Sequence, residues 1–227
     1  MRVLAIDTAL GACSAAVLDT GAGVVAAHDS IAMQRGHAEA LMPLIARVME
    51  RTHSTFTELD RIAVTTGPGS FTGLRVGIAA ARGIALASAK PAVGITTLAA
   101  YAAPFIAADD SLPVVAVIDA RHEHVYLQVF GPGGRTIVTP RLLPLREALR
   151  VAATGSPRLT GTAASMLAAA WPPGERAPRA VEQRAAPDID WVARLGALAR
   201  DTEAPVKPFY LRAPEAQPQD ASPLARR

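Results

Sequence analysis

The sequence predicts an α/β protein of two lobes, each built on a mixed β-sheet flanked by helices. In the first half, short apolar runs of strand length alternate with helical patterns, in the order βββαβαβα. A strand that ends in aspartate and continues into a hairpin occurs twice, once at Asp7 and once at Asp119. We therefore predict two related lobes, at residues 1–107 and 108–212.

The first-lobe elements follow from local patterns. Apolar runs joined by tight turns predict an antiparallel meander over Val3–Asp7, Ser14–Leu18 and Val24–Asp29. A helix is expected at His37–Glu50, and Pro43 should bend it or delay its start. The remaining predictions are a strand at Ile62–Thr66, a helix from about Leu74, a strand at Pro91–Ile95 and a helix at Thr97–Ala107.

The second half begins like the first and then loses its pattern. Strands are predicted at Pro113–Asp119 and His124–Phe130, followed by a turn at Gly131–Gly134. Proline and alanine become dense from Thr154, and only one further helix is indicated, at Ile189–Arg200. We predict a reduced second lobe and a disordered polar tail at residues 213–227.

The most informative segment runs from Arg61 to Ala87. A buried strand leads into a loop with four closely spaced residues of Gly or Pro, and a helix follows. Strand, glycine-rich turn and helix is the layout that aims backbone N–H groups at a phosphate or another anion. The loop lacks the Gly-Lys-Ser/Thr sequence of a P-loop, which argues against ATP hydrolysis.

The helix of this segment is apolar on nearly every side. Arg82 is its only charged residue between Val76 and Ala89. Small residues recur every four positions, at Gly73, Gly77, Ala81 and Ala85. A helix that is apolar all round must be buried all round, so we expect one side to cover the sheet and the small-residue strip to meet a partner. The alternative is a helix enclosed entirely within its own chain.

Composition narrows the functional classes. The single cysteine, Cys13, excludes an internal disulfide and suits a reducing cytoplasm. A secretory signal and an uncharged run of membrane-spanning length are both missing, so we expect a cytoplasmic protein with no membrane association. The net charge is +3, and its scattered arginines do not indicate an autonomous nucleic-acid-binding module. His122 and His124 share one strand face without a third ligand, so no metal site is predicted.

Longer sequence words point to relatives. The two aspartate-bearing strand–hairpin units resemble the actin, sugar-kinase and Hsp70 (ASKHA) superfamily. The words LAIDTALGACSAAVL, RGHAEALMPLI, GPGSFTGLRVGIAAARGIALA, GITTLAAYA, VIDARHEHVY and PFYLR occur in this order. They resemble the bacterial TsaB family, needed for threonylcarbamoyladenosine in tRNA and formerly grouped with M22 glycoproteases. The resemblance covers the first 130 residues, thins, and returns at Pro208–Arg212.

The superfamily resemblance implies nucleotide or phosphate contacts at Asp7, Thr8 and Asp119. An aspartate at a strand end is also often only a local cap. The acidic companions of the first turn are replaced here by Gly11 and Ala12. We therefore expect no cofactor in the isolated chain, and any bound nucleotide at a composite site shared with a partner.

The resemblance also implies a non-catalytic role. The catalytic paralogue, TsaD, binds a metal through a His-x-x-x-His pair, and the matching positions here are Thr97 and Tyr101. Its Gly-Gly turn in the second lobe is matched by Ala120 and Arg121. The alternatives are an M22-type metallopeptidase, a nucleotide-dependent transferase of the same fold, or a small-molecule kinase, and these replacements count against each of them.

A non-catalytic relative must act through binding. The resemblance implies a heterodimer with TsaD through the first-lobe helices, recruitment of the ATPase TsaE, and contact with tRNA only through the complex. Without TsaD, a homodimer through the same helices is expected. The predicted interface residues are Leu41, Leu44, Ile45, Val48, Gly73, Val76, Gly77, Ala80, Ala81 and Ile84.

Overall fold

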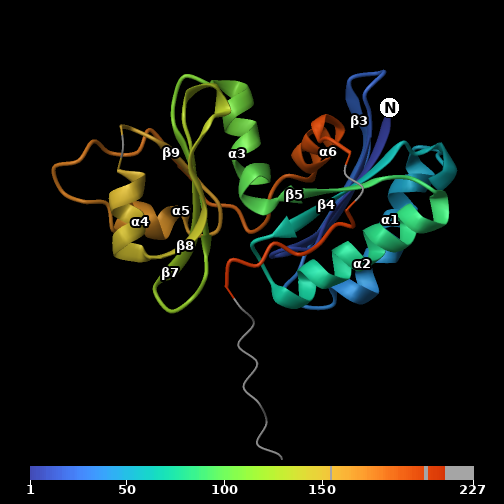
Figure 1. Ribbon diagram of the computed structural model, residues 1–227, viewed down its shortest axis with the longest axis horizontal. Helices are drawn as coiled ribbons and strands as arrows, with labels where there is room; N and C mark the ends of the chain where they lie inside the picture. Colours follow the sequence, from blue (N-terminus) through green and yellow to red (C-terminus); the bar gives the residue numbers. More distant parts are fainter. Residues whose placement is uncertain (154, 202–203, 213–227) are drawn as a thin grey trace, which may run out of the picture.

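Two lobes lie side by side in the computed structural model, which describes residues 1–153, 155–201 and 204–212 (Figure 1). The first sheet has the order β3-β2-β1-β4-β5 and the second the order β10-β9-β6-β7-β8. Their strands are β1 (Arg2–Asp7), β2 (Ala12–Asp19), β3 (Val24–Ala32), β4 (Arg61–Gly67), β5 (Ala92–Thr96), β6 (Val114–Asp119), β7 (His124–Phe130), β8 (Thr136–Pro144), β9 (Arg158–Thr160) and β10 (Ala180–Glu182). The predicted tail at 213–227 lies outside the described residues.

The two sheets repeat one plan, which confirms the predicted duplication. In the first lobe, β1 pairs antiparallel with β2 and parallel with β4. In the second, β6 pairs antiparallel with β7 and parallel with β9. The second lobe therefore retains a five-stranded sheet, a point that the sequence left open. Its last two strands have only three residues each, too few for a recognisable alternating pattern.

Helices cover both faces of each sheet (Figure 1). α1 (His37–Arg51) and α2 (Phe71–Ser88) pack on one face of the first sheet, and α6 (Ile189–Leu198) packs on the other. α3 (Thr97–Ala108) covers the second sheet between the lobes, opposite α4 (Leu145–Ala152) and α5 (Ala164–Ala169). Short 3₁₀ turns lie at Phe56–Glu58 and Pro132–Gly134. Within the described residues, the helices are too short or too polar to cross a lipid bilayer.

Two helices belong to the opposite lobe from the one predicted. Leu98 and Tyr101 of α3 pack with Val114 and Ile118 of β6, in the second lobe. α6 returns to the first lobe, where Val192 joins the cluster beneath the first sheet. The chain therefore crosses between the lobes twice, and a single boundary at residue 107 does not divide it.

Most element boundaries match the predictions, and the exceptions have local causes. α2 begins at Phe71, three residues before the predicted start, because Ser70 caps it by accepting a hydrogen bond from the Gly73 amide at 3.3 Å. α1 begins at His37 and continues through Pro43, so the proline does not delay its start.

Arg61 fastens the end of α6 to the first sheet. Its side chain is 8% exposed and donates to the carbonyl oxygens of Gly196 at 2.7 Å and Ala199 at 2.6 Å. It also pairs with the Asp201 carboxylate at 2.7 Å. Because the carbonyls at a helix C-terminus lack partners within the helix, a buried guanidinium that satisfies them stabilises this junction.

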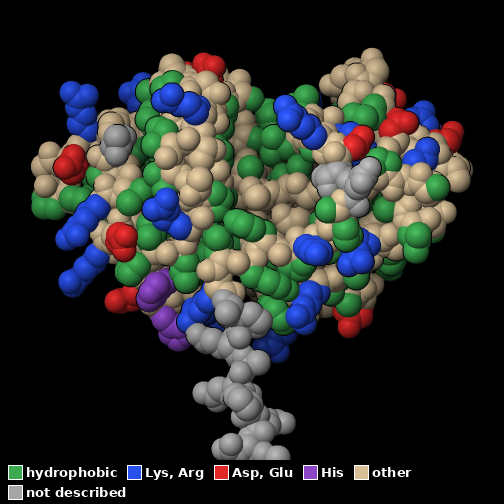
Figure 2. All heavy atoms as spheres, viewed as in Figure 1, with side chains coloured by type: hydrophobic (Ala, Val, Ile, Leu, Met, Phe, Trp, Pro, Cys, Tyr) green, Lys and Arg blue, Asp and Glu red, His purple; other side chains and the backbone are tan. Residues whose placement is uncertain are grey.

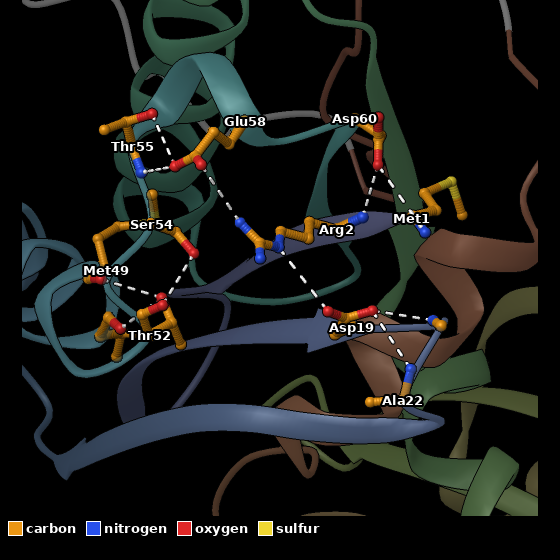
Figure 3. A network of polar contacts seen from close by, with 12 residues as sticks. Met1, Arg2, Asp19, Ala22, Met49, Thr52, Ser54, Thr55, Glu58 and Asp60 are labelled. Carbon is orange, nitrogen blue, oxygen red and sulfur yellow. Dashed lines mark hydrogen bonds and ion pairs between the residues drawn. The ribbon is translucent and has the colours of Figure 1, made fainter.

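Arg2, at the start of β1, forms a looser network on the surface (Figure 3). Its guanidinium lies 3.8 Å from Asp19 and 3.7 Å from Glu58, and its amide donates to Asp60 at 2.7 Å. Hydrogen bonds from the Gly21 amide lower the pKa of Asp19, and those from the Thr55 amide lower that of Glu58. Water screens these exposed pairs, so they contribute little to stability.

We predict that Arg61→Met lowers the free energy of unfolding by about 2–4 kcal/mol, because it leaves buried carbonyls without a donor. The matched control, Arg2→Met, should cost less than about 1 kcal/mol. Urea denaturation of the two variants measures the difference. Equal losses would mean that the Arg61 contacts do not hold α6 in place.

Candidate functional site

The turn after β1 holds the most deeply buried of the predicted site residues. The Asp7 side chain is fully buried, and its Oδ1 accepts hydrogen bonds from Thr65 Oγ1 at 2.5 Å and from the Ala9 amide at 3.1 Å. Its Oδ2 has no hydrogen-bond partner. Burial raises the pKa of Asp7 to about 6, against the opposing effect of these hydrogen bonds. Asp7 is therefore a local cap as well as an enclosed carboxylate.

Thr8 is enclosed by the glycine loop and the start of α2. Its hydroxyl donates to the Gly73 carbonyl oxygen at 2.7 Å. A Cβ atom added at Gly73 would lie 2.1 Å from the Thr8 carbonyl oxygen, and one at Gly77 would lie 2.4 Å from the Thr8 hydroxyl oxygen. The strip of small residues on α2 therefore faces inward, with Gly73 and Gly77 against Thr8 and with Ala81 and Ala85 in the core. This corrects the expectation that the strip meets a partner.

Two amides of the glycine loop are used within this chain, so they are not available to bind an anion. The Ser70 amide donates to the Ala9 carbonyl oxygen at 2.7 Å, and the Gly73 amide donates to the Ser70 hydroxyl. A Cβ atom at Gly69 would lie 2.4 Å from the same Ala9 oxygen. The loop thus closes the β1 turn, and Gly69, Ser70 and Phe71 also line the cleft between the lobes.

Asp119 is placed differently, at the exposed end of β6. Its Oδ1 accepts a hydrogen bond from the Arg121 amide at 2.8 Å, and its amide donates to the Thr162 hydroxyl at 2.9 Å. The next residues, Arg121, His122 and Glu123, all have left-handed backbone, with φ of 63°, 50° and 58°. Residues other than glycine rarely adopt this conformation, so the backbone is strained at these three positions. Arg121 is also one of the two positions matched to the expected Gly-Gly turn.

A polar cleft of about 620 Å³ separates the lobes near these turns. Gln34, His37 and Ser70 line it from the first lobe, and Asp119 and Arg121 line it from the second. Asp7 and Thr8 do not line the cleft, so the structure does not bring the three predicted phosphate-binding residues together. The Asp7 carboxylate is sealed, and Ser70 occupies the Gly73 amide at the start of α2, so both groups already have contacts within this chain.

The two positions that match the expected metal-binding histidine pair are part of the core. Thr97 is fully buried, and the buried Tyr101 donates its hydroxyl to the Arg184 carbonyl oxygen at 3.1 Å. Among the described residues, groups of three or more His, Cys, Asp or Glu side chains close enough to hold a metal ion are absent. His124 Nδ1 lies 2.7 Å from the His122 carbonyl oxygen, which makes this pair a feature of the strained hairpin.

Most of the predicted interface residues lie in the core, and this corrects the residue assignment. α1 and α2 both bury their regular apolar stripes against the first sheet. Only Val76 and Ala80 of the ten keep intermediate exposure. The buried ones are Leu41, Leu44, Ile45, Val48, Gly73, Gly77, Ala81 and Ile84.

The outward sides of α1 and α2 nevertheless form an apolar groove of about 540 Å³, the helix-pair groove. Its lining includes Met42, Phe56, Ala80, Gly83 and Ala87. Met42 is 48% exposed, and a Cβ atom at Gly83 would meet nothing within 4 Å. Of the residues that line the groove, sequence reasoning identified Ala80 and Ile84. The sequence offered one signal for the remaining lining residues, which is the presence of Met42 on the polar side of α1.

We predict opposite effects for two Gly→Ala substitutions in α2. Gly73→Ala should destabilise the protein by about 1–3 kcal/mol or more, because its methyl group would overlap the Thr8 backbone. Gly83→Ala should stabilise it by up to about 1 kcal/mol, because the site is open and alanine favours the helix. Thermal unfolding of both variants tests the prediction. A neutral Gly73→Ala would show that α2 does not rest directly on the turn.

We also predict a pH-dependent effect of Asp7→Asn. The pKa of Asp7 is raised from about 4 in the unfolded chain, so its native carboxyl holds a proton more tightly. The associated stability is present at low pH and is lost as pH rises through 6. Between pH 7.5 and pH 5, wild type should gain about 1–2 kcal/mol relative to Asp7→Asn in urea titrations. If the stability difference between wild type and Asp7→Asn is the same at both pH values, the Asp7 carboxylate is not buried without compensation.

Comparison with known proteins adds a family to this geometry. The family model of TsaD, tRNA N6-adenosine threonylcarbamoyltransferase, matches residues 24–184. The tRNA threonylcarbamoyladenosine biosynthesis protein TsaB of Escherichia coli (strain K12) is 38% identical over 126 residues, 56% of this chain and 53% of that protein. The match thus spans about half of that relative. An uncharacterized protein of Mycobacterium tuberculosis is 33% identical over 223 residues, covering 95% of this chain and 94% of its own.

Solved structures agree on the fold. YeaZ from Pseudomonas aeruginosa superposes with a TM-score of 0.77 at 27% identity, covering 92% of this chain and 99% of YeaZ. The polyphosphate/ATP-glucomannokinase of an Arthrobacter strain has a TM-score of 0.51 at 13% identity, covering 87% and 98%. At this low identity, the match to the glucomannokinase shows only that the fold is shared. Together they confirm the predicted two-lobed ASKHA-like architecture.

Proposed function

Because the chain belongs to the TsaB branch of the tRNA N6-adenosine threonylcarbamoyltransferase family, we propose that it is a non-catalytic subunit needed to make threonylcarbamoyladenosine in tRNA. The observation that carries this proposal is a contrast. The groups that would do chemistry in a catalytic relative are sealed or replaced, whereas the outer side of the first-lobe helices is open and apolar.

The state of the candidate groups supports the proposed non-catalytic role. Asp7 lies beneath the glycine loop, where a substrate cannot reach its carboxylate. Thr97 and Tyr101 are enclosed between α3 and its neighbours and offer no imidazole to a metal. Such a chain contributes by binding, so we propose that it binds and activates the transferase TsaD.

The helix-pair groove is the proposed TsaD-binding surface. Ala80, Gly83 and Ala87 follow one another at intervals of three and four along α2, so they form a flat strip on one outward side. Small side chains let a partner helix approach closely, and the flexible Met42 can adapt to its surface. Since an apolar groove of this kind is self-complementary, we propose that it also forms the homodimer when TsaD is absent.

The proposals for the other partners rest on the family. We propose that the heterodimer recruits TsaE, that tRNA reaches the chain only through the complex, and that the complex works in the cytoplasm. Any nucleotide in the inter-lobe cleft would need residues from TsaD as well, since Asp7 does not line the cleft. Such a nucleotide would therefore sit in a site shared between the two subunits.

The test is reconstituted threonylcarbamoyl transfer to tRNA by TsaD, TsaE and threonylcarbamoyl-adenylate, with this chain titrated in. Wild type should stimulate transfer to saturation. Ala87→Glu should raise the half-maximal concentration at least about tenfold, because a carboxylate would be buried in the groove. Ala169→Glu, an exposed alanine of α5 in the second lobe, is the matched control and should behave like wild type.

Transfer that does not depend on this chain would remove the proposed function. If Ala87→Glu stimulates transfer as strongly as wild type, the proposed function stands, but TsaD must bind elsewhere than in the helix-pair groove. Light scattering of the same mixtures separates these cases, because it reports heterodimer formation independently of chemistry.

A further inference from the structure

α2 is a ridge between two grooves. Gly83 lines the helix-pair groove on one side and a second, shallower groove of about 880 Å³ on the other. The second groove lies between α2 and the segment 204–206, and we call it the strap groove. Leu86, Pro91, Pro205 and Val206 supply apolar surface to it. Leu86 is 86% exposed, the highest value among the exposed large hydrophobic residues that the structure describes.

The charged side chains that line the strap groove are positive. Arg82 and Lys90 line it, and the described lining contains no carboxylate. Neither cation makes an ion pair with another described residue. Figure 2 shows the corresponding face, where Lys and Arg side chains stand among hydrophobic ones over α2 and the neighbouring C-terminal segment. An apolar surface flanked by unpaired cations is complementary to an apolar segment flanked by carboxylates.

Two other occupants fit this surface less well. A second copy of the chain would use the same residues on both sides of a two-fold axis, which would bring the cations of two grooves together. A single-stranded nucleic acid would need ring faces for its bases, but the described lining is aliphatic. The helix-pair groove lacks these cations, so the two flanks of α2 differ in the partner they favour.

We propose that the strap groove docks an acidic amphipathic segment of another protein, with apolar side chains against Leu86 and Pro205 and carboxylates against Arg82 and Lys90. This inference goes beyond the proposed function and does not rest on it.

The test uses two synthetic 16-residue helical peptides with leucines on one face and either glutamates or lysines beside them. Fluorescence anisotropy measures the binding of each to the full chain. The glutamate peptide should bind at least about tenfold more tightly than the lysine peptide. The double variant Arg82→Glu, Lys90→Glu should reverse that order, and Leu86→Ser should weaken binding of the glutamate peptide.

The control is Arg146→Glu, Arg150→Glu, which makes the same change of net charge on exposed positions of α4. It should leave the preference for the glutamate peptide unchanged. Equal effects of the two double variants would reduce the preference to overall charge and overturn the proposal. Absence of saturable binding by the glutamate peptide would overturn it as well.

The natural occupant is found by a photoreactive amino acid placed at position 86 in cells. Mass spectrometry of the cross-linked peptide should identify an acidic amphipathic segment of another protein. Cross-links only to a second copy of this chain, or only to RNA, would contradict the assignment.

Discussion

The contact on which the rest of this structure depends is the close approach of α2 to the turn after β1. Gly73 and Gly77 leave room for Thr8, and Gly69 leaves room for the carbonyl oxygen of Ala9. Larger side chains at these positions would separate the helix from the sheet. The same contact seals Asp7, uses the donors of the glycine loop, and decides which side of α2 remains outward.

The two lobes share one topology but differ at the corresponding turns. In the first lobe the turn is closed by its own glycine loop, and its aspartate is fully buried. In the second lobe Asp119 remains at the cleft, beside three consecutive residues in left-handed backbone. Only one of the two aspartates therefore lines the cleft. This asymmetry explains why the outer surface of the first lobe, and not the cleft, is the better candidate for function.

Much of this fold could be predicted from residues alone, and the failures have physical causes. The meander, the helix at His37 and the repeat of Asp7 at Asp119 follow from local periodicity and turns. The inward direction of the small-residue strip could not be predicted, because Gly73 and Gly77 give the same pattern whether the approaching backbone is internal or external. The pattern of α6 shows that it is apolar but not which sheet it covers, since that depends on contacts distant in sequence.

The candidate site was predictable only in part for the same reason. Helical spacing identifies apolar side chains such as Leu44, and in a domain of this size those side chains form the core. Residues that remain for a partner are the irregular ones, such as Met42 and Gly83, which sequence alone does not separate from ordinary surface. Asp7 was recognised by its place at a strand end, but its enclosure became visible only with the glycine loop packed over it.

Hydrogen–deuterium exchange of this chain, with and without TsaD and in the absence of nucleotide, tests the central claim most directly. The account predicts slower exchange in α1 and α2, which border the helix-pair groove, and unchanged exchange in the Arg121–Glu123 hairpin. Slower exchange confined to the hairpin and the inter-lobe cleft would contradict it, because function would then lie in the cleft and not on the helices.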